Sequence, residues 1–425
     1  MTYRIPNTET FIVDYNEQSA ICYSPLKEEI SLIDAPTASI LCSGQPSYFD
    51  DELRNFLDEL ITDSSKNKIL SRRRIRKETK LSLIPNSICN LACSYCYSAA
   101  GRNQSRLSID NLETTLDWFI NKQRIDGDSI SIFITGGGEP LATWDITSHA
   151  IYTAHELASN RGLKLYVSLI TNGTLLDEEK IKFLKKYGCP VGISFDVLED
   201  IQNANRGKYN TVRRNIHRLL EEGMKVMINS TVIPSSVSRI AEAVETVVRE
   251  YPGLAQYTVE PVTGTGLFGS PKDMRIFYDT FLNEYFRAKD IAVSHGLKMR
   301  FTFDDSLRGV TSRHCPGKFT LTPSGHISVC HLVSSLREDR FGECTYGIVA
   351  DGKLTIDDDK FDRLYAHNVF EYQECADCIA KWSCGGECLT RRSTYPPEYM
   401  AEVCRFNRKV VRRLLKEEVK DVKFT

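Results

Sequence analysis

Between residues 81 and about 262 the sequence alternates between short apolar runs and longer amphipathic segments. The apolar runs have the length and composition of buried strands, and the segments between them have apolar residues at helical spacing. Such alternation indicates a parallel sheet covered by helices, and six repeats suit a partial (β/α)6 barrel better than a flat sheet. The predicted strands are LSLIP, SIFITGGG, LYVSLITN, VGISFD, KVMINSTVIP and QYTVEPV, and the predicted helices span 109–124, 147–159, 177–187, 210–222 and 237–249.

The region before this repeat differs in composition. Three short extended runs, TFIVDY, SAICYSP and EISLID, precede ASILCS and the helix-like FDDELRNFLDELI. They predict a small α+β module over residues 1–78. A basic run, SRRRIRKETK at 71–80, is interpreted as a solvated linker, with a groove for an acidic peptide as the alternative.

The region after the repeat is rich in cysteine, glycine and short strands. A helical stretch over 271–295 and the run KMRFTF complete the barrel, which we place at 79–304. A third domain then covers 305–425. It contains a predicted hairpin, KFTLTPSGHISVCHL, whose turn is PSG, and a closing basic helix, RFNRKVVRRLLKEEVK.

Composition narrows the function class. The chain has 425 residues and a formal net charge of -2, so its overall charge favours neither nucleic acid nor membrane as a partner. It has no secretory signal and no apolar run of transmembrane length, which predicts a soluble cytoplasmic protein. Fourteen cysteines in a reducing compartment favour metal or cluster ligands over disulfides.

Three of these cysteines follow the first predicted barrel strand. Cys89, Cys93 and Cys96 lie on a single loop, where the backbone can wrap all three sulfurs around one metal centre. Structural zinc normally takes four ligands, whereas a [4Fe-4S] cluster held by three cysteines keeps one iron free for an exogenous ligand. The spacing therefore predicts a reactive cluster with an open position.

A second motif, GGEP at Gly137–Pro140, ends the second predicted strand. Glycine lets the backbone approach a ligand without an intervening side chain, although a plain strand-to-helix turn is the alternative. With the three spaced cysteines and the aromatic Tyr95 before the last of them, this motif resembles the radical S-adenosylmethionine (SAM) superfamily. The resemblance implies that the cluster binds SAM and that Gly137, Gly138, Glu139 and Pro140 contact its methionine amino group, with Tyr95 beside the cluster.

Weaker matches extend this resemblance. Ser194, at the end of the fourth predicted strand, and Arg206, in the following loop, resemble residues that hold the cofactor carboxylate, which suits the planar guanidinium of arginine. Asn172, in TNG, resembles the ribose-side turn, although Asn-Gly is also a favoured turn in its own right. No catalytic acid or base is assigned.

The C-terminal cysteines resemble the seven-cysteine SPASM pattern, which includes Gly325, and imply two auxiliary iron-sulfur clusters, expected to be [4Fe-4S]. Zinc is the alternative for paired CxxC groups. By the family pattern one set contains four thiolates: Cys375, Cys378, Cys384 and Cys404. The other set contains three: Cys315, Cys330 and Cys388.

The three-cysteine set leaves its fourth ligand open. Cys344, His314 or His331 completes it, or the site stays open for a substrate group such as a peptide thiolate, which is the alternative we favour. In sulfatase-maturing relatives an aspartate assigned as base follows the second SPASM cysteine, whereas His331 stands here, so formylglycine formation is disfavoured. Cys22, Cys42 and Cys189 are interpreted as core residues.

The resemblance implies a radical SAM/SPASM peptide maturase. An electron from the reduced cluster would cleave SAM to a 5′-deoxyadenosyl radical, which takes hydrogen from a ribosomally made precursor peptide and leads to an oxidative thioether or carbon-carbon cross-link. The expected partners are that peptide, with its leader held by the N-terminal module, and a one-electron reductant such as flavodoxin or ferredoxin. The alternatives are a radical SAM dehydrogenase, a formylglycine-forming enzyme and a non-catalytic zinc-binding adaptor.

Overall fold

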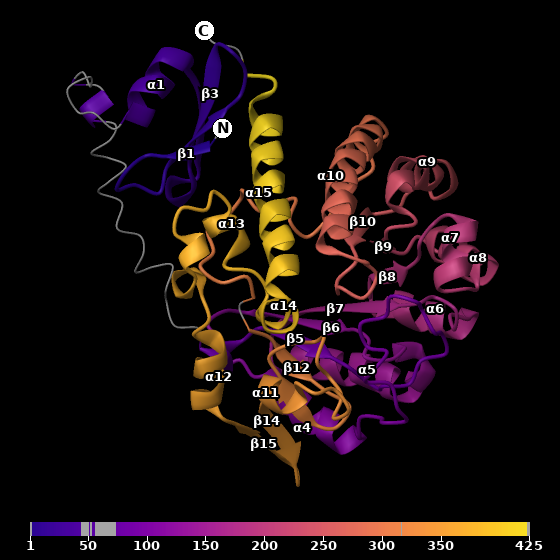
Figure 1. The fold of residues 1–425 in the computed structure, drawn as a ribbon. Coiled ribbons are helices and arrows are strands. Elements are labelled where there is room, and N and C mark those ends of the chain that lie inside the picture. Colours follow the sequence, from indigo (N-terminus) through magenta and orange to yellow (C-terminus); the bar gives the residue numbers. More distant parts are fainter. Residues whose placement is uncertain (1, 44–50, 52, 56–73, 316, 423–425) are drawn as a thin grey trace.

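The computed structural model describes residues 2–43, 51, 53–55, 74–315 and 317–422 (Figure 1). Of the helix-like run at 49–61 only residues 51 and 53–55 are among them, and the start of the basic run lies outside. The N-terminal part is an antiparallel sheet in the order β1-β2-β3-β4, and it contains the three predicted strands. ASILCS is helical, within α1. The bounds are β1 Thr2–Arg4, β2 Phe11–Asp14, β3 Ser19–Ser24, β4 Glu29–Asp34 and α1 Ala35–Ser43.

The predicted barrel strands are all present. They are parallel neighbours in the order β5-β6-β7-β8-β9-β10, and a short seventh strand, β11, extends this edge, so the expected α/β fold with a mostly parallel sheet is confirmed. Their bounds are β5 Lys80–Leu83, β6 Ser129–Ile134, β7 Lys164–Thr171, β8 Val191–Ser194, β9 Val226–Val232, β10 Gln256–Pro261 and β11 Met299–Arg300.

The helices of the repeat lie outside this sheet (Figure 1). Capping side chains fix several of their starts: Ser108 accepts a hydrogen bond from the backbone N–H of Asn111, and Asp177 accepts one from that of Lys180. The additional short helix α7 was not predicted. The bounds are α4 Ile109–Phe119, α5 Trp144–Asn160, α6 Glu178–Lys186, α7 Glu199–Asn205, α8 Tyr209–Glu221, α9 Ile240–Glu250 and α10 Pro271–Ser294.

Burial alternates along the barrel strands. In β9, Val226, Ile228 and Val232 are buried, whereas the intervening Asn229 and Thr231 are partly exposed. A parallel sheet covered on both faces would bury every position. One face therefore packs under the helices, and the polar positions of the other face remain accessible and lead into the cavity described below.

The cysteine-rich region continues the same sheet. β12 pairs in parallel with β5, and the predicted hairpin follows it, with Gly325 in the left-handed region at φ 78°. The eleven-stranded sheet thus crosses the expected boundary at residue 304. The strand bounds are β12 Phe319–Leu321, β13 His326–Ser328, β14 Thr345–Ala350 and β15 Lys353–Ile356.

The last helix, α15 (Pro397–Val419), begins eight residues before the predicted basic helix and includes Cys404. It lies beside α10 and also contacts β3 and β4 (Figure 1). The carboxylate of Glu402 accepts a hydrogen bond from Arg275 Nε at 3.0 Å, which joins α15 to α10. Shorter helices are α11 Phe341–Cys344, α12 Asp358–Tyr365, α13 Lys381–Cys384, α14 Leu389–Thr394 and the 3-10 turns η1 Pro25–Lys27, η3 Ile75–Lys77, η4 Pro140–Thr143, η5 Val237–Arg239, η6 Val369–Glu371 and η7 Gln373–Cys375.

Within the described part of the chain, none of the helices combines the length and apolar character that crossing a bilayer requires.

Candidate functional site

A cavity of about 360 Å³ lies at the carboxyl ends of the barrel strands. This is the end of a parallel α/β sheet at which ligands usually bind. The cysteine loop, the GGEP segment and the ends of β8 to β10 surround it. The structure brings together here every residue predicted for the reactive cluster and its cofactor: Cys89, Cys93, Tyr95, Cys96, Gly137, Gly138, Glu139, Pro140, Asn172, Ser194 and Arg206.

The GGEP segment packs directly on the start of the cysteine loop. The backbone N–H of Gly138 donates to the carbonyl of Asn86 at 3.0 Å, and that of Glu139 donates to the carbonyl of Ile88 at 2.6 Å. A Cβ at Gly138 would lie 2.2 Å from the Ile88 carbonyl oxygen and 2.3 Å from Asn86 Oδ1. Glycine is therefore required here for the close approach of two backbone segments.

The carboxylate of Glu139 joins this segment to the TNG turn. It accepts hydrogen bonds from the Thr171 hydroxyl at 2.5 Å and from the backbone N–H of Asn172 at 2.8 Å. Burial raises the pKa of Glu139, and these donors partly offset the rise. The side chain of Asn172 is also engaged, because its Nδ2 donates to Asn90 Oδ1 at 2.9 Å. Both residues thus shape the wall of the cavity through contacts within the protein.

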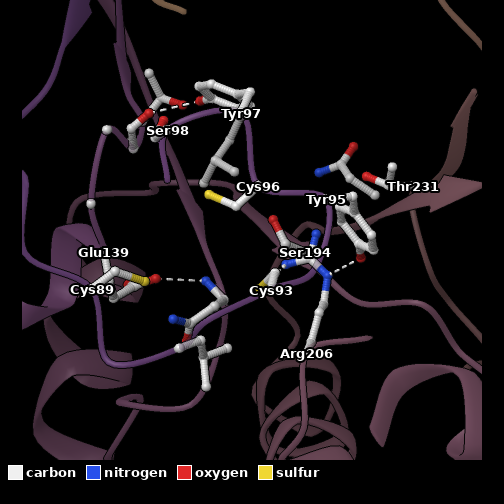
Figure 2. Close-up of a pocket in the computed structure, with 18 of the residues that line it drawn as sticks. Cys89, Cys93, Tyr95, Cys96, Tyr97, Ser98, Glu139, Ser194, Arg206 and Thr231 are labelled. Carbon is white, nitrogen blue, oxygen red and sulfur yellow. Dashed lines mark hydrogen bonds between the residues drawn. The ribbon is translucent and has the colours of Figure 1, made fainter. Parts of the chain in front are cut away.

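Arg206 and Tyr95 form a buried polar cluster with Asp196. Arg206 Nε donates to the Tyr95 hydroxyl at 2.5 Å, and that hydroxyl donates to Asp196 Oδ2 at 2.5 Å. Figure 2 shows the Arg206 side chain reaching this hydroxyl beside Cys93 and Ser194. Burial alone lowers the pKa of Arg206, but its interactions with Tyr95, Asp196 and Cys93 outweigh this effect and raise the pKa. The guanidinium therefore stays cationic at the cavity wall.

Two arginines lie beside the cysteine sulfurs. Arg102 Nη2 lies 3.2 Å from Cys96 Sγ, and Arg206 Nη1 lies 3.9 Å from Cys93 Sγ. Burial raises the pKa of the Cys89 and Cys93 thiols, and the arginine charges lower it. A thiolate donor set on one loop, with cations beside it and a glycine-lined wall opposite, suits an iron-sulfur cluster together with a ligand that carries a carboxylate.

Three residues of the cavity region were missed by the sequence interpretation: Arg102, Asp196 and Glu260. Asp196 is the last residue of the predicted strand VGISFD, so its position at a strand end was an available signal. Glu260 had the same signal, because it stands near the end of the predicted strand QYTVEPV, whereas Arg102 had none. Glu260, at the end of β10, accepts a hydrogen bond from the Thr302 hydroxyl at 2.6 Å, and burial raises its pKa.

The C-terminal cysteines separate into the two expected neighbourhoods. Burial raises the pKa of Cys330 to about 12, and the nearby Cys388, Cys315 and Cys344 contribute to this rise. Burial likewise raises the pKa of Cys375 to about 11, with Cys378 and Cys404 as its cysteine neighbours, and Cys384 also lies near Cys404 and Cys378. The grouping of the cysteines matches the predicted sets, while their role as cluster ligands stays a prediction.

The candidates for the fourth ligand lie in different directions. His314 faces the other set, with Nδ1 3.2 Å from the Cys384 carbonyl oxygen and Nε2 3.8 Å from Glu387 Oε1. His331 lines the cavity at the strand ends, and its Nδ1 lies 2.5 Å from Lys318 Nζ. Cys344 is buried near Cys330 and Cys388. Of the three, Cys344 is the one with both of these cysteines as electrostatic neighbours.

One part of the chain matches a known protein family. Residues 83–247 match the family model of the Radical SAM superfamily. A cysteine-type anaerobic sulfatase-maturating enzyme of Clostridium perfringens is 32% identical over 123 residues, which cover 28% of this chain and 33% of that protein. The alignments span about a third of the length of the first curated relatives.

Two solved structures share the fold over most of the chain. Native anSMEcpe with bound AdoMet superposes with a TM-score of 0.64 at 18% identity, covering 81% of this chain and 100% of that one. Streptococcus suis SuiB bound to precursor peptide SuiA superposes with a TM-score of 0.55 at 17% identity, covering 94% and 98%. At these identities the likeness concerns the fold.

Proposed function

Because residues 83–247 form a radical SAM domain, we propose that this protein is a radical SAM/SPASM enzyme that oxidatively cross-links a ribosomally made precursor peptide. The observation that carries the proposal is the convergence of three cysteines, the GGEP segment and Arg206 on one cavity. When bound, the cluster and SAM would supply a 5′-deoxyadenosyl radical that abstracts hydrogen from substrate.

The residues of the chain have defined tasks in this proposal. Cys89, Cys93 and Cys96 would hold the reactive cluster, and Arg102 would offset part of its negative charge. The guanidinium of Arg206, kept cationic by Asp196, would bind the cofactor carboxylate. Backbone groups of Gly137, Gly138 and Pro140, with Glu139 fixed between two loops, would orient the amino group. Ser194 and Asn172 would complete the wall and limit access of water.

A peptide substrate is supported by two features. The accessible face of the barrel strands leads into the cavity, and the SuiB structure that shares this fold was solved with its precursor peptide bound. Two additional cysteine sets, if they hold auxiliary clusters, could accept the two electrons that an oxidative cross-link releases. The proposed domains remain 1–78, 79–304 and 305–425, with the first binding a leader segment, and the proposed electron donor is a small redox protein.

Sulfatase maturation is the second candidate, because relatives of that function match the barrel sequence. His331 bears on this choice. Burial and the neighbouring Lys318 lower its pKa to about 3, so the imidazole next to the cavity is neutral, whereas the sulfatase-maturing pattern has an aspartate at this position. A neutral imidazole that faces a lysine differs in charge from a carboxylate base, and we therefore favour peptide cross-linking.

Iron and acid-labile sulfide per chain, measured after anaerobic reconstitution, test the proposal. We expect about 12 irons in the wild type and about 8 in the C89A/C93A/C96A variant, as for three four-iron clusters of which one is lost. The variant should also lose reductive cleavage of SAM, whereas the matched control C42A, in the N-terminal module, should retain both. Zinc in place of iron in the wild type would refute the radical mechanism.

A further inference from the structure

A second groove, of about 620 Å³, lies where three distant parts of the chain meet. The end of β2, the middle of α10 and the C-terminal half of α15 enclose it. Figure 1 shows α10 and α15 side by side. No residue lines both this groove and the catalytic cavity. The lining residues are Val13, Asp14, Asp279, Leu282, Asn283, Lys409, Arg412, Arg413 and Lys416.

The cations of the groove are held in place by neighbouring groups. Arg412 Nε donates to the Thr2 hydroxyl at 2.8 Å. Arg413 Nε donates to Glu417 Oε1 at 2.9 Å, and its guanidinium lies 4.8 Å from the centre of the Phe286 ring. These hydrogen bonds engage the Nε–H of each guanidinium. Because the side chains are already held, less side-chain entropy is lost when an anion binds to their Nη groups.

The groove has a mixed charge pattern. Four cationic side chains line it together with two carboxylates, Asp14 and Asp279. Asp279 accepts a hydrogen bond from Lys409 Nζ at 2.8 Å, so part of the positive charge is balanced within the protein. A phosphate chain, with a charge at every unit, would place some charges against these carboxylates. Because Arg413 already pairs with Glu417, carboxylates spaced along a peptide can instead pair with Arg412 and Lys416.

We propose that this groove binds an acidic segment of the peptide substrate, outside the residues that react. The inference rests on the proposed function, because it assigns the groove to the substrate of the same enzyme. Val13 and Leu282 also line the groove and are largely buried, so they form an apolar part of its wall. Binding at this groove, away from the cavity, would keep the substrate attached to the enzyme while its reacting residue moves within the cavity.

Fluorescence anisotropy tests the groove directly. The probe is a fluorescein-labelled octapeptide of alternating Glu and Leu, compared with the same peptide carrying Gln in place of Glu. We expect saturable binding of the Glu peptide, with a Kd raised about tenfold or more in R412Q/K416Q and unchanged in K122Q/K186Q, whose charges lie on the distant barrel surface. K416E, which changes an exposed residue, should also weaken binding.

Three results would overturn the proposal: equal binding of the Glu and Gln peptides, unchanged binding in R412Q/K416Q and K416E, or tighter binding of polyphosphate than of the Glu peptide. Iron content and peptide-independent cleavage of SAM are measured in the same preparations. We expect both to stay at the wild-type level in R412Q/K416Q. A wild type without iron would refute the proposed function alone, because the anisotropy result does not depend on the cluster.

Discussion

Glu9 of the N-terminal sheet and Lys381 of the cysteine-rich region form a buried ion pair, with 2.9 Å between Oε1 and Nζ and side chains only 8% and 6% exposed. Trp382 Nε1 donates to the other carboxylate oxygen at 2.8 Å, and Arg4 Nη2 donates to Oε1 at 3.0 Å. Lys381 lies between Cys378 and Cys384. The N-terminal module is therefore fixed against the segment that carries one predicted ligand set.

Replacing Glu9 with alanine should destabilise this contact strongly. The E9A variant leaves Lys381 buried without its anion, and the loss of one partner of a buried pair lowers the free energy of unfolding by about 3 kcal/mol. Urea unfolding followed by tryptophan fluorescence measures the change. The control E17A removes an exposed carboxylate of the same module and should change it by less than about 0.5 kcal/mol. Equal effects of the two variants would contradict the prediction.

Glu387 should be equally sensitive, because it is 1% exposed and lies between Cys384 and Cys388. Its carboxylate accepts hydrogen bonds from Asn407 Nδ2 at 2.7 Å, Arg391 Nη1 at 3.1 Å and the backbone N–H of Cys388 at 3.0 Å. The E387Q variant leaves Arg391 without its counter-charge, so we expect about 3 kcal/mol lower stability in chemical unfolding. E398Q, at an exposed position, is the control, and an unchanged midpoint in E387Q would refute this role.

Gly138 should tolerate no side chain. The added Cβ of G138A would overlap the Ile88 carbonyl and Asn86 Oδ1, so one of the two loops must shift. A strain of about 1–3 kcal/mol is typical of such overpacking. If it is borne by the SAM-binding form of the loop, SAM should bind about 5- to 150-fold more weakly. Equilibrium dialysis with labelled SAM measures the affinity. G266A, where a Cβ meets nothing within 4 Å, should bind like the wild type.

The contact between α10 and α15 should depend on pH through Asp279. Burial raises the pKa of Asp279, but Lys409 and Arg405, at 2.8 and 2.9 Å, outweigh this and hold it below its ordinary value. A carboxyl whose pKa falls on folding contributes stability above its unfolded pKa of about 4 and loses it as the pH drops through the folded value. In D279N, stability should therefore fall less steeply below about pH 4, whereas D290N should follow the wild type.

Much of the barrel was predictable because its signal is local. Apolar runs identified β5 to β10, and helical spacing identified most of the helices between them. Capping residues such as Asp177 lie at helix starts that the sequence had already suggested. The pairing of β12 with β5 was not predictable, since a three-residue strand has no periodicity of its own and its partner lies more than 200 residues earlier. α7 is too short for its apolar spacing to be distinctive.

The residues of the candidate site also differ in whether the sequence alone could indicate them. Cys89, Cys93, Cys96 and GGEP were recognisable because the residue types and spacings are themselves the signal. Arg102 was not, because charged residues are common on loops and only the fold places it near the sulfurs. Glu260 stands near the end of a predicted strand, but nothing in its residue type distinguishes it from other residues at strand ends. The groove beside α15 likewise depends on tertiary structure, since its lining comes from three separate parts of the chain.

The parallel pairing of β5 with β12 also bears on how the chain folds during synthesis. The edge of β5 that faces β12 stays unpaired until residue 321 has left the ribosome, by which time the other barrel strands can already have formed. Contacts this distant in sequence slow folding and leave a strand edge open to intermolecular pairing. We expect truncation before Phe319 to give aggregation-prone protein, with the exposed edge directly before the cysteine loop.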